Sequence, residues 1–300
     1  MNFSNNHKKQ SDVKLPVCED CSLMVYWYDA YEETNGNPYI ILFGKIYNSE
    51  DKSFNSISIV VRNLERKIYL LPKLNKLKDI DLEDKKILEE NKDLTINMFQ
   101  EFEELRKNKF SFIKKIQTKP VIKKYCFELP IPQSKIKIYI ESIPFLKIKY
   151  NAEYGALPSS INSGEYFDHI FHKNRSFLEM FLLSRKIKGP CWLRIKSYEL
   201  PNGFNITWSQ LEVNCMKYKD IVVAEENMPA PPFKILSFST KVILNNNEKE
   251  IIAIAGICKD NYSVDEDSTN KKDTNYQNFV IMRKVDFKNV SHDFYGNFLI

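Results

Sequence analysis

The sequence of residues 185–193, Arg-Lys-Ile-Lys-Gly-Pro-Cys-Trp-Leu, predicts the end of a helix followed by the start of a strand at 191–195. Upstream, Ser176 and Glu179 have the S-x-x-E spacing of a capping box, which marks where a helix begins. Gly189 is placed to take the left-handed conformation that ends a helix, and Pro190 prevents continuation. The apolar residues of this helix share one face, which we expect to be buried: Phe177, Leu178, Phe181 and Leu182.

Three cations, Arg185, Lys186 and Lys188, fall in the expected last turn of this helix. Cations at a helix C-terminus compensate the helix dipole and keep the surface solvated. They are also candidates for contacts with nucleic acid. Because charge runs are weak signals, both interpretations stay open here.

Five stretches of the sequence together carry a resemblance to a known family. The stretches are Tyr26-Trp27-Tyr28-Asp29-Ala30-Tyr31-Glu32, Leu42-Phe43-Gly44-Lys45, Asn63-Leu64-Glu65-Arg66 with Tyr69-Leu70-Leu71-Pro72, Lys119-Pro120-Val121 with Phe127-Glu128-Leu129-Pro130, and the 185–193 segment itself. In this order, between about residue 24 and residue 257, they resemble the N-terminal region of family B replicative DNA polymerases, in their alpha branch. Each motif alone is weak, but five in the same order are specific.

The polar composition of the first residues predicts a disordered arm, which we assign to residues 1–22. The resemblance implies an N-terminal polymerase domain over 23–228 and the first part of an RNase H-like, exonuclease-like domain over 229–300. It also implies a parent enzyme that extends RNA primers on a DNA template in the nucleus, together with primase and an accessory subunit. The Mg²⁺ ions of such a polymerase belong to a palm domain outside these residues. We therefore expect no cofactor and no polymerase catalysis from this chain itself.

The composition is compatible with one large or two medium globular domains. The 300 residues are 43% hydrophobic, and the net charge is only +5, so the chain is not a polycation. Six cysteines in a chain of this length fit a reducing compartment better than a disulfide framework. The sequence has no apolar run of membrane-spanning length and no signal peptide.

The predicted secondary structure is α+β, because strands cluster before and after helices instead of alternating with them. Residues 79–108 are expected to be helical, since Leu94, Met98, Phe102 and Leu105 repeat at helix spacing, with Asp93 or Thr95 as caps. The proline cluster at 228–232 predicts a linker, and the polar segment 260–275 predicts a solvated loop. Strands are expected at 39–43, 58–61, 114–117, 125–129, 145–150, 206–214, 279–283 and, buried in a second domain, at 235–238 and 251–255.

The first strand after the linker contains Phe238-Ser239-Thr240-Lys241. In proofreading relatives the resemblance places an Asp-x-Glu pair here, and two carboxylates on alternate strand residues can bind one divalent ion. Ser239 and Lys241 replace that pair, and an ammonium repels a metal cation. Whether they are degenerate site positions or ordinary strand residues, we expect no exonuclease activity and no catalytic residue in this chain.

Other metal sites are weakly indicated. Cys18 and Cys21 have ligand spacing, but a structural zinc ion needs four ligands. His169 and His172 lie three residues apart around an expected helix start, where surface or capping roles are the common outcome. We therefore predict no metal site.

Charge is segregated along the chain. Residues 79–104 contain ten acidic residues against three lysines, whereas residues 105–149 contain twelve Lys or Arg against two acidic residues. Cations interleaved with exposed rings suit single-stranded nucleic acid, because backbone charge is neutralised while bases stack. The alternative is that the rings are core and the lysines are the solvated edge of a sheet. The candidates for binding are Lys114, Lys115, Lys123 and Lys124, interleaved with Phe110, Phe112, Tyr125 and Phe127.

Three functional hypotheses follow from the sequence. The first is the N-terminal portion of a replicative polymerase, which binds template and primer without catalysing. The second is a stand-alone module that binds single-stranded nucleic acid. The third is a proofreading nuclease of a sister branch, against which Ser239 and Lys241 argue directly.

Overall fold

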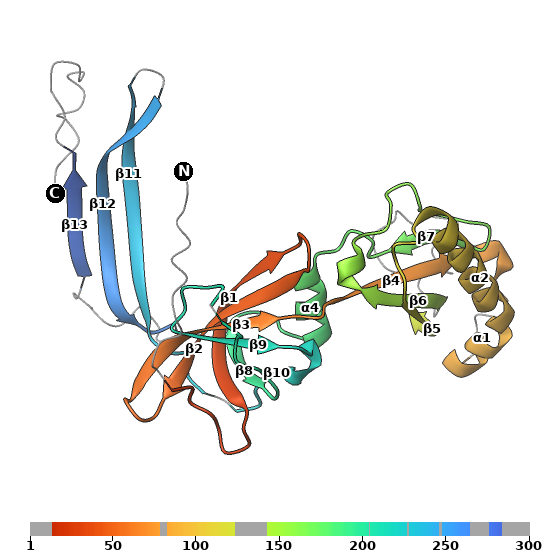
Figure 1. Cartoon of the computed structure of the whole chain (residues 1–300), viewed down its shortest axis with the longest axis horizontal. Coiled ribbons are helices and arrows are strands. Elements are labelled where there is room, and N and C mark those ends of the chain that lie inside the picture. Colours follow the sequence, from red (N-terminus) through yellow and green to blue (C-terminus); the bar gives the residue numbers. More distant parts are fainter. Residues whose placement is uncertain are drawn as a thin grey trace. The chain divides into compact units, whose positions relative to one another are not determined.

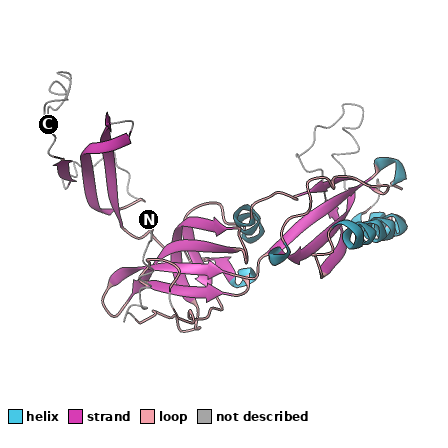
Figure 2. Cartoon of the chain, turned by 45° about the horizontal axis from the view of Figure 1, so that its top comes forward, coloured by secondary structure: helices cyan, strands magenta, loops and turns pink. Residues whose placement is uncertain are grey.

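The computed structural model describes residues 14–78, 83–123, 143–203, 205–226, 228–245, 248–264 and 276–283. The chain divides into two compact units, residues 1–226 and 227–300. The described residues are rich in sheet and contain few helices (Figures 1 and 2). No described helix has the length and apolar character needed to span a bilayer.

A six-stranded sheet forms the larger part of the first unit, in the order β10-β8-β1-β2-β3-β9. It is a mixed sheet, because β3 and β9 are parallel while its other pairs are antiparallel. Its core includes apolar side chains from all six strands and from the helix α4. The strands are β1 Leu23–Glu33, β2 Tyr39–Asn48, β3 Ser53–Val61, β8 Cys191–Ile195, β9 Leu211–Cys215 and β10 Ile221–Val223.

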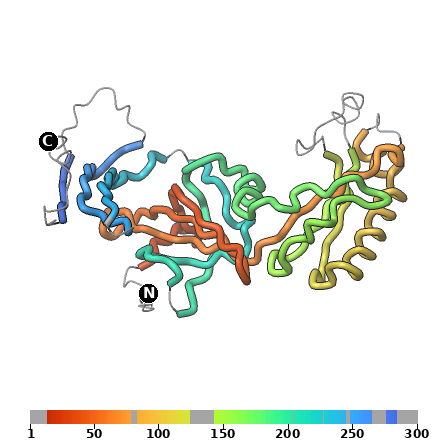
Figure 3. The backbone as a smooth tube through the Cα atoms, turned by 90° about the horizontal axis from the view of Figure 1, so that it is seen from above, coloured from red at the N-terminus to blue at the C-terminus, as the bar shows by residue number. Residues whose placement is uncertain are grey.

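A four-stranded antiparallel sheet lies within the same unit, in the order β5-β6-β4-β7. The chain leaves the first sheet after β3, builds the second sheet and returns through α4 to β8 (Figure 3). The strands are β4 Glu65–Pro72, β5 Ile116–Lys123, β6 Ile143–Asn151 and β7 Phe167–Phe171. The helices α1 Asp84–Glu90 and α2 Lys92–Lys109 connect β4 to β5.

Helix α2 covers one face of the four-stranded sheet. Leu94, Met98 and Phe102 are buried and belong to the same core cluster as Ile68 of β4 and Ile148 of β6. These helix residues recur every three or four positions, so they fall on one side of the helix, as the sequence predicted. The opposite face of the sheet has its own small core cluster, against which Leu74 of the 3-10 helix η1 (Leu74–Lys76) packs, and it becomes the surface of interest below (Figure 2).

The helical region differs from its prediction in two ways. It breaks at Asn91, whose amide nitrogen donates to the Ile87 carbonyl at 2.9 Å and to the Lys78 carbonyl at 2.8 Å. Asn91 is also the N-cap of α2, so the prediction that Asp93 or Thr95 is the cap is wrong. Residues 79–82 lie outside the described part of the chain.

Helix α4, Phe177–Arg185, begins as predicted but ends differently. The Ser176 hydroxyl accepts from the Glu179 backbone N–H at 3.0 Å, as a cap requires. The left-handed residue at its C-terminus is Lys186, at φ 59°, and Gly189 has no positive φ. The Lys186 and Ile187 N–H groups bond to the Leu183 and Leu182 carbonyls in a Schellman arrangement, so Gly189 is not the terminator and only Arg185 lies in the last turn.

The described part of the second unit is a three-stranded antiparallel meander, β11 Phe233–Asn245, β12 Glu248–Tyr262 and β13 Tyr276–Met282. Gly256 of β12 lies under the ring of Phe279, since a Cβ there would come within 2.4 Å of that ring. The predicted strands at 235–238 and 251–255 exist, but their expected burial is wrong for several large side chains. Phe238 is 62% exposed and Ile251 is 51% exposed, because no second layer packs on them within the described residues.

Residues 14–22, expected to belong to a disordered arm, have defined partners. Leu15 packs against the core of the six-stranded sheet, and Arg194 donates to the Asp20 carboxylate at 2.9 Å. The disorder prediction is therefore wrong for these residues, whereas residues 1–13 lie outside the described part of the chain. The predicted strand at 206–214 is shorter, because β9 begins at Leu211; the predicted strand at 125–129 and most of the predicted loop at 260–275 also lie outside the described residues.

Candidate nucleic-acid interface

Five lysines share the face of the four-stranded sheet opposite α2. Alternate residues of a strand point to the same side, and the strand register aligns Lys67 with Lys149 and Lys147 with Lys119. Lys123 lies on the same side of β5, four residue pairs further along. We call this surface the lysine face: Lys67 of β4, Lys119 and Lys123 of β5, and Lys147 and Lys149 of β6.

Tyr69 forms the floor of the lysine face. Its ring is buried, at 8% exposed, and it belongs to a small core cluster with Leu71, Phe145 and Phe171. The ammonium of Lys123 lies 4.7 Å from the ring centroid of Tyr69, and that of Lys147 lies 5.8 Å from it. Both cations are therefore held over one aromatic ring, where the ring's quadrupole attracts them.

The lysine face is electropositive because its cations outnumber the carboxylates near them. Burial lowers the pKa of Lys147, and the charges of Lys149, Lys67 and Lys123 lower it further, whereas Glu65 alone acts in the opposite direction. Glu65 accepts from the Lys149 ammonium at 3.4 Å. A surface on which neighbouring ammonium groups repel one another gains free energy when an anion binds between them.

The structure places the predicted binding residues at different points relative to this face. Lys123 lies on it, and Lys114 and Lys115 are exposed in the turn that precedes β5. Lys124 lies outside the described residues. Of the predicted lysines that the structure describes, Lys123 is the one on the lysine face, and their contact with nucleic acid stays a prediction.

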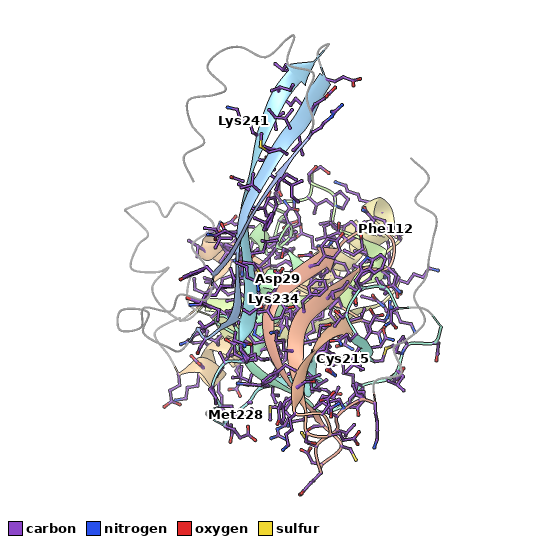
Figure 4. The ribbon with its side chains drawn as sticks, turned by 90° about the vertical axis from the view of Figure 1, so that its left-hand side faces the viewer. Asp29, Phe112, Cys215, Met228, Lys234 and Lys241 are labelled. Carbon is purple, nitrogen blue, oxygen red and sulfur yellow. The ribbon has the colours of Figure 1, made fainter. Side chains whose placement is uncertain are left out.

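The two predicted aromatic partners that the structure describes do not form a stacking surface. Phe110 is 1% exposed and packs in the core against Phe102, whereas Phe112 is 45% exposed (Figure 4). Tyr125 and Phe127 lie outside the described residues. Since Phe110 and Tyr69 are buried, a ligand on the described surface would contact mainly the lysine side chains and few aromatic rings.

The three cations of the helix end are not part of the lysine face. The Arg185 Nε donates to the Ile221 carbonyl at 2.7 Å, which ties α4 to β10 of the six-stranded sheet. Lys186 and Lys188 are exposed beside it. Arg185 therefore has a structural partner. Contact of Arg185, Lys186 and Lys188 with nucleic acid stays a prediction.

Lys67, Lys147 and Lys149 were missed because their proximity depends on strand pairing. The signal in the sequence was the alternation of Lys147 and Lys149 with apolar residues, which is typical of a strand with one polar face. The alignment of β4 with β6, about 80 residues apart in sequence, follows from tertiary structure only.

Ser239 and Lys241 lie on the same face of β11, as alternate strand residues must. Their cross-strand neighbours on β12 are Ala255 and Ala253. Figure 4 shows Lys241 well along the β11–β12 ribbon from Lys234. An ammonium, a hydroxyl and two methyl groups do not provide the oxygen ligands that Mg²⁺ requires, so these positions do not fit a metal site.

The other candidate metal ligands, His169, His172, Cys18 and Cys21, are not gathered into a metal-binding group in the described structure. His169 lies within β7 and not at a helix start, with its ring 4.7 Å from that of Phe171. Cys21 donates its N–H to the Cys18 carbonyl in a tight turn. Within the described ranges, no group of three or more His, Cys, Asp or Glu side chains could hold a metal ion.

Comparison with known proteins gives one consistent result. Residues 168–296 match the exonuclease domain of DNA polymerase family B. The chain is 35% identical to the DNA polymerase alpha catalytic subunit of Sterkiella nova over 96% of its length, and 35% identical to that of Xenopus laevis over 80% of its length. It is a homologue of the DNA polymerase alpha catalytic subunits.

The chain spans about a fifth of its relatives, 18% of the Sterkiella nova protein and 16% of the Xenopus laevis protein. The match to the family B exonuclease domain starts in β7 and continues through α4 into the second unit. All five residues of the lysine face therefore precede the segment that matches the exonuclease domain.

Proposed function

We propose that this chain is the N-terminal portion of a DNA polymerase alpha catalytic subunit, and that its lysine face binds single-stranded template DNA or the RNA–DNA primer during primer extension. The observation that carries this proposal is the gathering of five lysines on one face of the sheet, with the ammonium groups of Lys123 and Lys147 over the ring of Tyr69. Burial lowers the pKa of Lys147, and repulsion by the neighbouring ammonium charges lowers it further. A phosphodiester backbone placed between them relieves that repulsion and releases condensed counterions.

The dimensions of the sheet suit a short single strand. Cross-strand neighbours lie about 5 Å apart at Cβ, and alternate residues of one strand lie about 7 Å apart. The five ammonium groups of the lysine face therefore form a patch a few nucleotides long. Faces of four-stranded sheets are established surfaces for single-stranded nucleic acid. Here the apolar side chains around Tyr69 are buried, so the lysines supply the main contact in place of exposed rings.

The second unit supports a degenerate exonuclease-like role. Its β11-β12-β13 meander is compatible with the first three strands of an RNase H-like sheet, and Ser239 and Lys241 occupy the positions expected for metal ligands. The residues of this chain would then position nucleic acid, while Mg²⁺-dependent nucleotidyl transfer takes place elsewhere in the polymerase. Nuclear location and assembly with primase and an accessory subunit belong to the same proposal.

The test is a binding titration with a labelled 20-nucleotide single strand and a primer–template. Replacing Lys119, Lys123 and Lys149 by Glu in one variant should weaken binding at least tenfold, because three phosphate contacts become three repulsions. The matched control replaces three exposed lysines of α1 and α2 by Glu: Lys85, Lys86 and Lys92.

Equal weakening by the two triple variants would mean that net charge alone governs binding, and the proposal would fail. Unchanged binding in the lysine-face variant would also refute it. The stand-alone binding module is not favoured as an alternative, because the matched relatives are polymerase catalytic subunits.

A further inference from the structure

An open pocket of about 510 Å³ lies beside β7, the edge strand of the four-stranded sheet. Its polar lining is cationic or amide in character, and none of the described residues that line it is acidic. The volume falls within the range of small-ligand sites, about 300–1,000 Å³. The lining residues that matter here are Asn162, His169, His172, Lys173, Asn174 and Arg175.

Lys173 builds one wall of this pocket. Its ammonium is buried and donates to the carbonyls of Ser159 and Ile161, each at 3.0 Å, and to the Asn162 side-chain oxygen at 2.5 Å. These described partners are neutral oxygens, so they fix the 158–162 loop without cancelling the charge. Burial lowers the pKa of Lys173. A fixed cation behind the wall favours an anion in the pocket.

Arg175 supplies a second cation at the rim. Its Nε lies 3.3 Å from a carboxylate oxygen of Glu179, which is itself about half exposed. The first N–H groups of α4 are already used, since Glu32 accepts from Phe177 and Leu178. Any anion in the pocket therefore depends on side chains, and a guanidinium beside two amides and two imidazoles is a donor set suited to phosphate.

The pocket and the lysine face have the ring of Tyr69 as a common neighbour. The His172 ring lies 5.2 Å from the ring of Tyr69, the same ring that Lys123 and Lys147 cover. His169 pairs with Leu71, on the same side of the sheet as Tyr69. His172 itself has φ 64°, an uncommon conformation for a residue other than glycine, at the bend between β7 and Lys173.

We propose that this pocket binds the phosphate group of one nucleotide of the single strand that crosses the lysine face. The inference rests on the proposed function and deepens it, because it fixes where the strand leaves the sheet. Arg175 and His172 would contact the phosphate oxygens, while Lys173 would contribute charge from behind the wall.

The experiment uses the full chain and three probes: dT12, thymidine 5′-monophosphate and thymidine. The variants are Arg175→Gln, His172→Gln and, as a control, Arg283→Gln, which also removes an exposed arginine from a Glu pair. We expect Arg175→Gln and His172→Gln each to weaken dT12 about fivefold to tenfold, with the control unchanged. We also expect the monophosphate, but not thymidine, to bind the wild type and to compete with dT12. Circular dichroism melts would verify that each variant is folded.

The outcomes separate this inference from the proposed function. If the pocket variants bind dT12 like the wild type while the lysine-face variant loses it, the pocket inference is overturned and the interface stands. Binding of the monophosphate without competition from dT12 would indicate a site for free nucleotides and would equally overturn it. If every pocket variant and the lysine-face variant bind dT12 as tightly as the wild type, both the pocket inference and the proposed function are contradicted.

Discussion

At the scale of single residues, Lys147 shows that the charges of the lysine face do not stabilise the fold. Its ammonium is partly desolvated beside three other cations, so its pKa lies below the ordinary value. The unfolded chain therefore binds more protons than the folded chain between the two pKa values, and the Lys147 contribution to stability becomes more favourable as pH rises through that window. Near neutral pH the charged lysine opposes folding.

Lys147→Met should therefore raise the melting temperature slightly, by about 1–2 °C at low salt, because it removes a repelled charge and keeps an unbranched apolar chain. The same change should weaken single-strand binding. Thermal melts at low and high salt measure the first effect, which should shrink with salt as repulsion is screened. The control is Lys86→Met on α1, and a fall in melting temperature for Lys147→Met alone would contradict the electrostatic interpretation.

At the scale of elements, the termini of α4 show how far local sequence determines structure. The Ser176 cap follows from residues three apart, and so it was predictable. The C-terminus was assigned to Gly189 because glycine takes positive φ without strain, but the chain turns three residues earlier, at Lys186. The backbone pairing of Lys186 and Ile187, together with burial of Ile187, outweighs the preference for glycine.

Lys186→Gly should consequently increase the free energy of unfolding by about 0.5–1 kcal/mol. Glycine removes the strain of the left-handed conformation, and the higher backbone entropy of the unfolded chain offsets only part of this gain. Gly189→Ala should not decrease it, because no atom lies within 4 Å of a Cβ placed there. Urea denaturation of both variants measures the difference. If Lys186→Gly is not stabilised and Gly189→Ala loses more than about 1 kcal/mol of unfolding free energy, Gly189 is the helix terminator after all.

The lysine face illustrates the limit of the sequence at this scale. Strand positions in β4 and β6 follow from alternation of polar and apolar residues, but the alignment of Lys67 with Lys149 is a register between distant segments. Burial was equally hard to infer for β11 and β12, because burial depends on what packs against a strand. Local patterns thus predicted most strands, part of the helices and one residue of the lysine face, Lys123.

At the scale of the whole molecule, the two units differ in how much apolar surface they bury. All three core clusters lie within residues 1–226, whereas several large side chains of the second unit are exposed. A fragment of residues 1–226 should therefore unfold in one cooperative transition, within about 3 °C of the main transition of the full chain. Calorimetry of both proteins measures this, and a fragment without a transition would show that the second unit is needed for folding.

The second unit should have no 3′→5′ exonuclease activity, and Ser239→Asp with Lys241→Glu should not create one. The neighbouring positions on that face are Ala255 and Ala253, so a new carboxylate pair would find no further ligand from the adjacent strand. Wild type and double variant are incubated with 3′-labelled single-stranded DNA in Mg²⁺ and in Mn²⁺. Stepwise shortening by the wild type that a chelator abolishes would show that the site is not degenerate.

The most direct test of the nucleic-acid interface is the salt dependence of single-strand binding. Each phosphate neutralised on a single strand contributes about −0.7 to the slope of log K against log salt, so the five lysines predict a slope of about −3.5. Replacing Lys119, Lys123 and Lys149 by Gln should reduce it to about −1.4, whereas replacing Lys85, Lys86 and Lys92 by Gln should leave it unchanged. A lysine-face variant with the wild-type slope would contradict the account, because phosphates would then be bound elsewhere on the molecule.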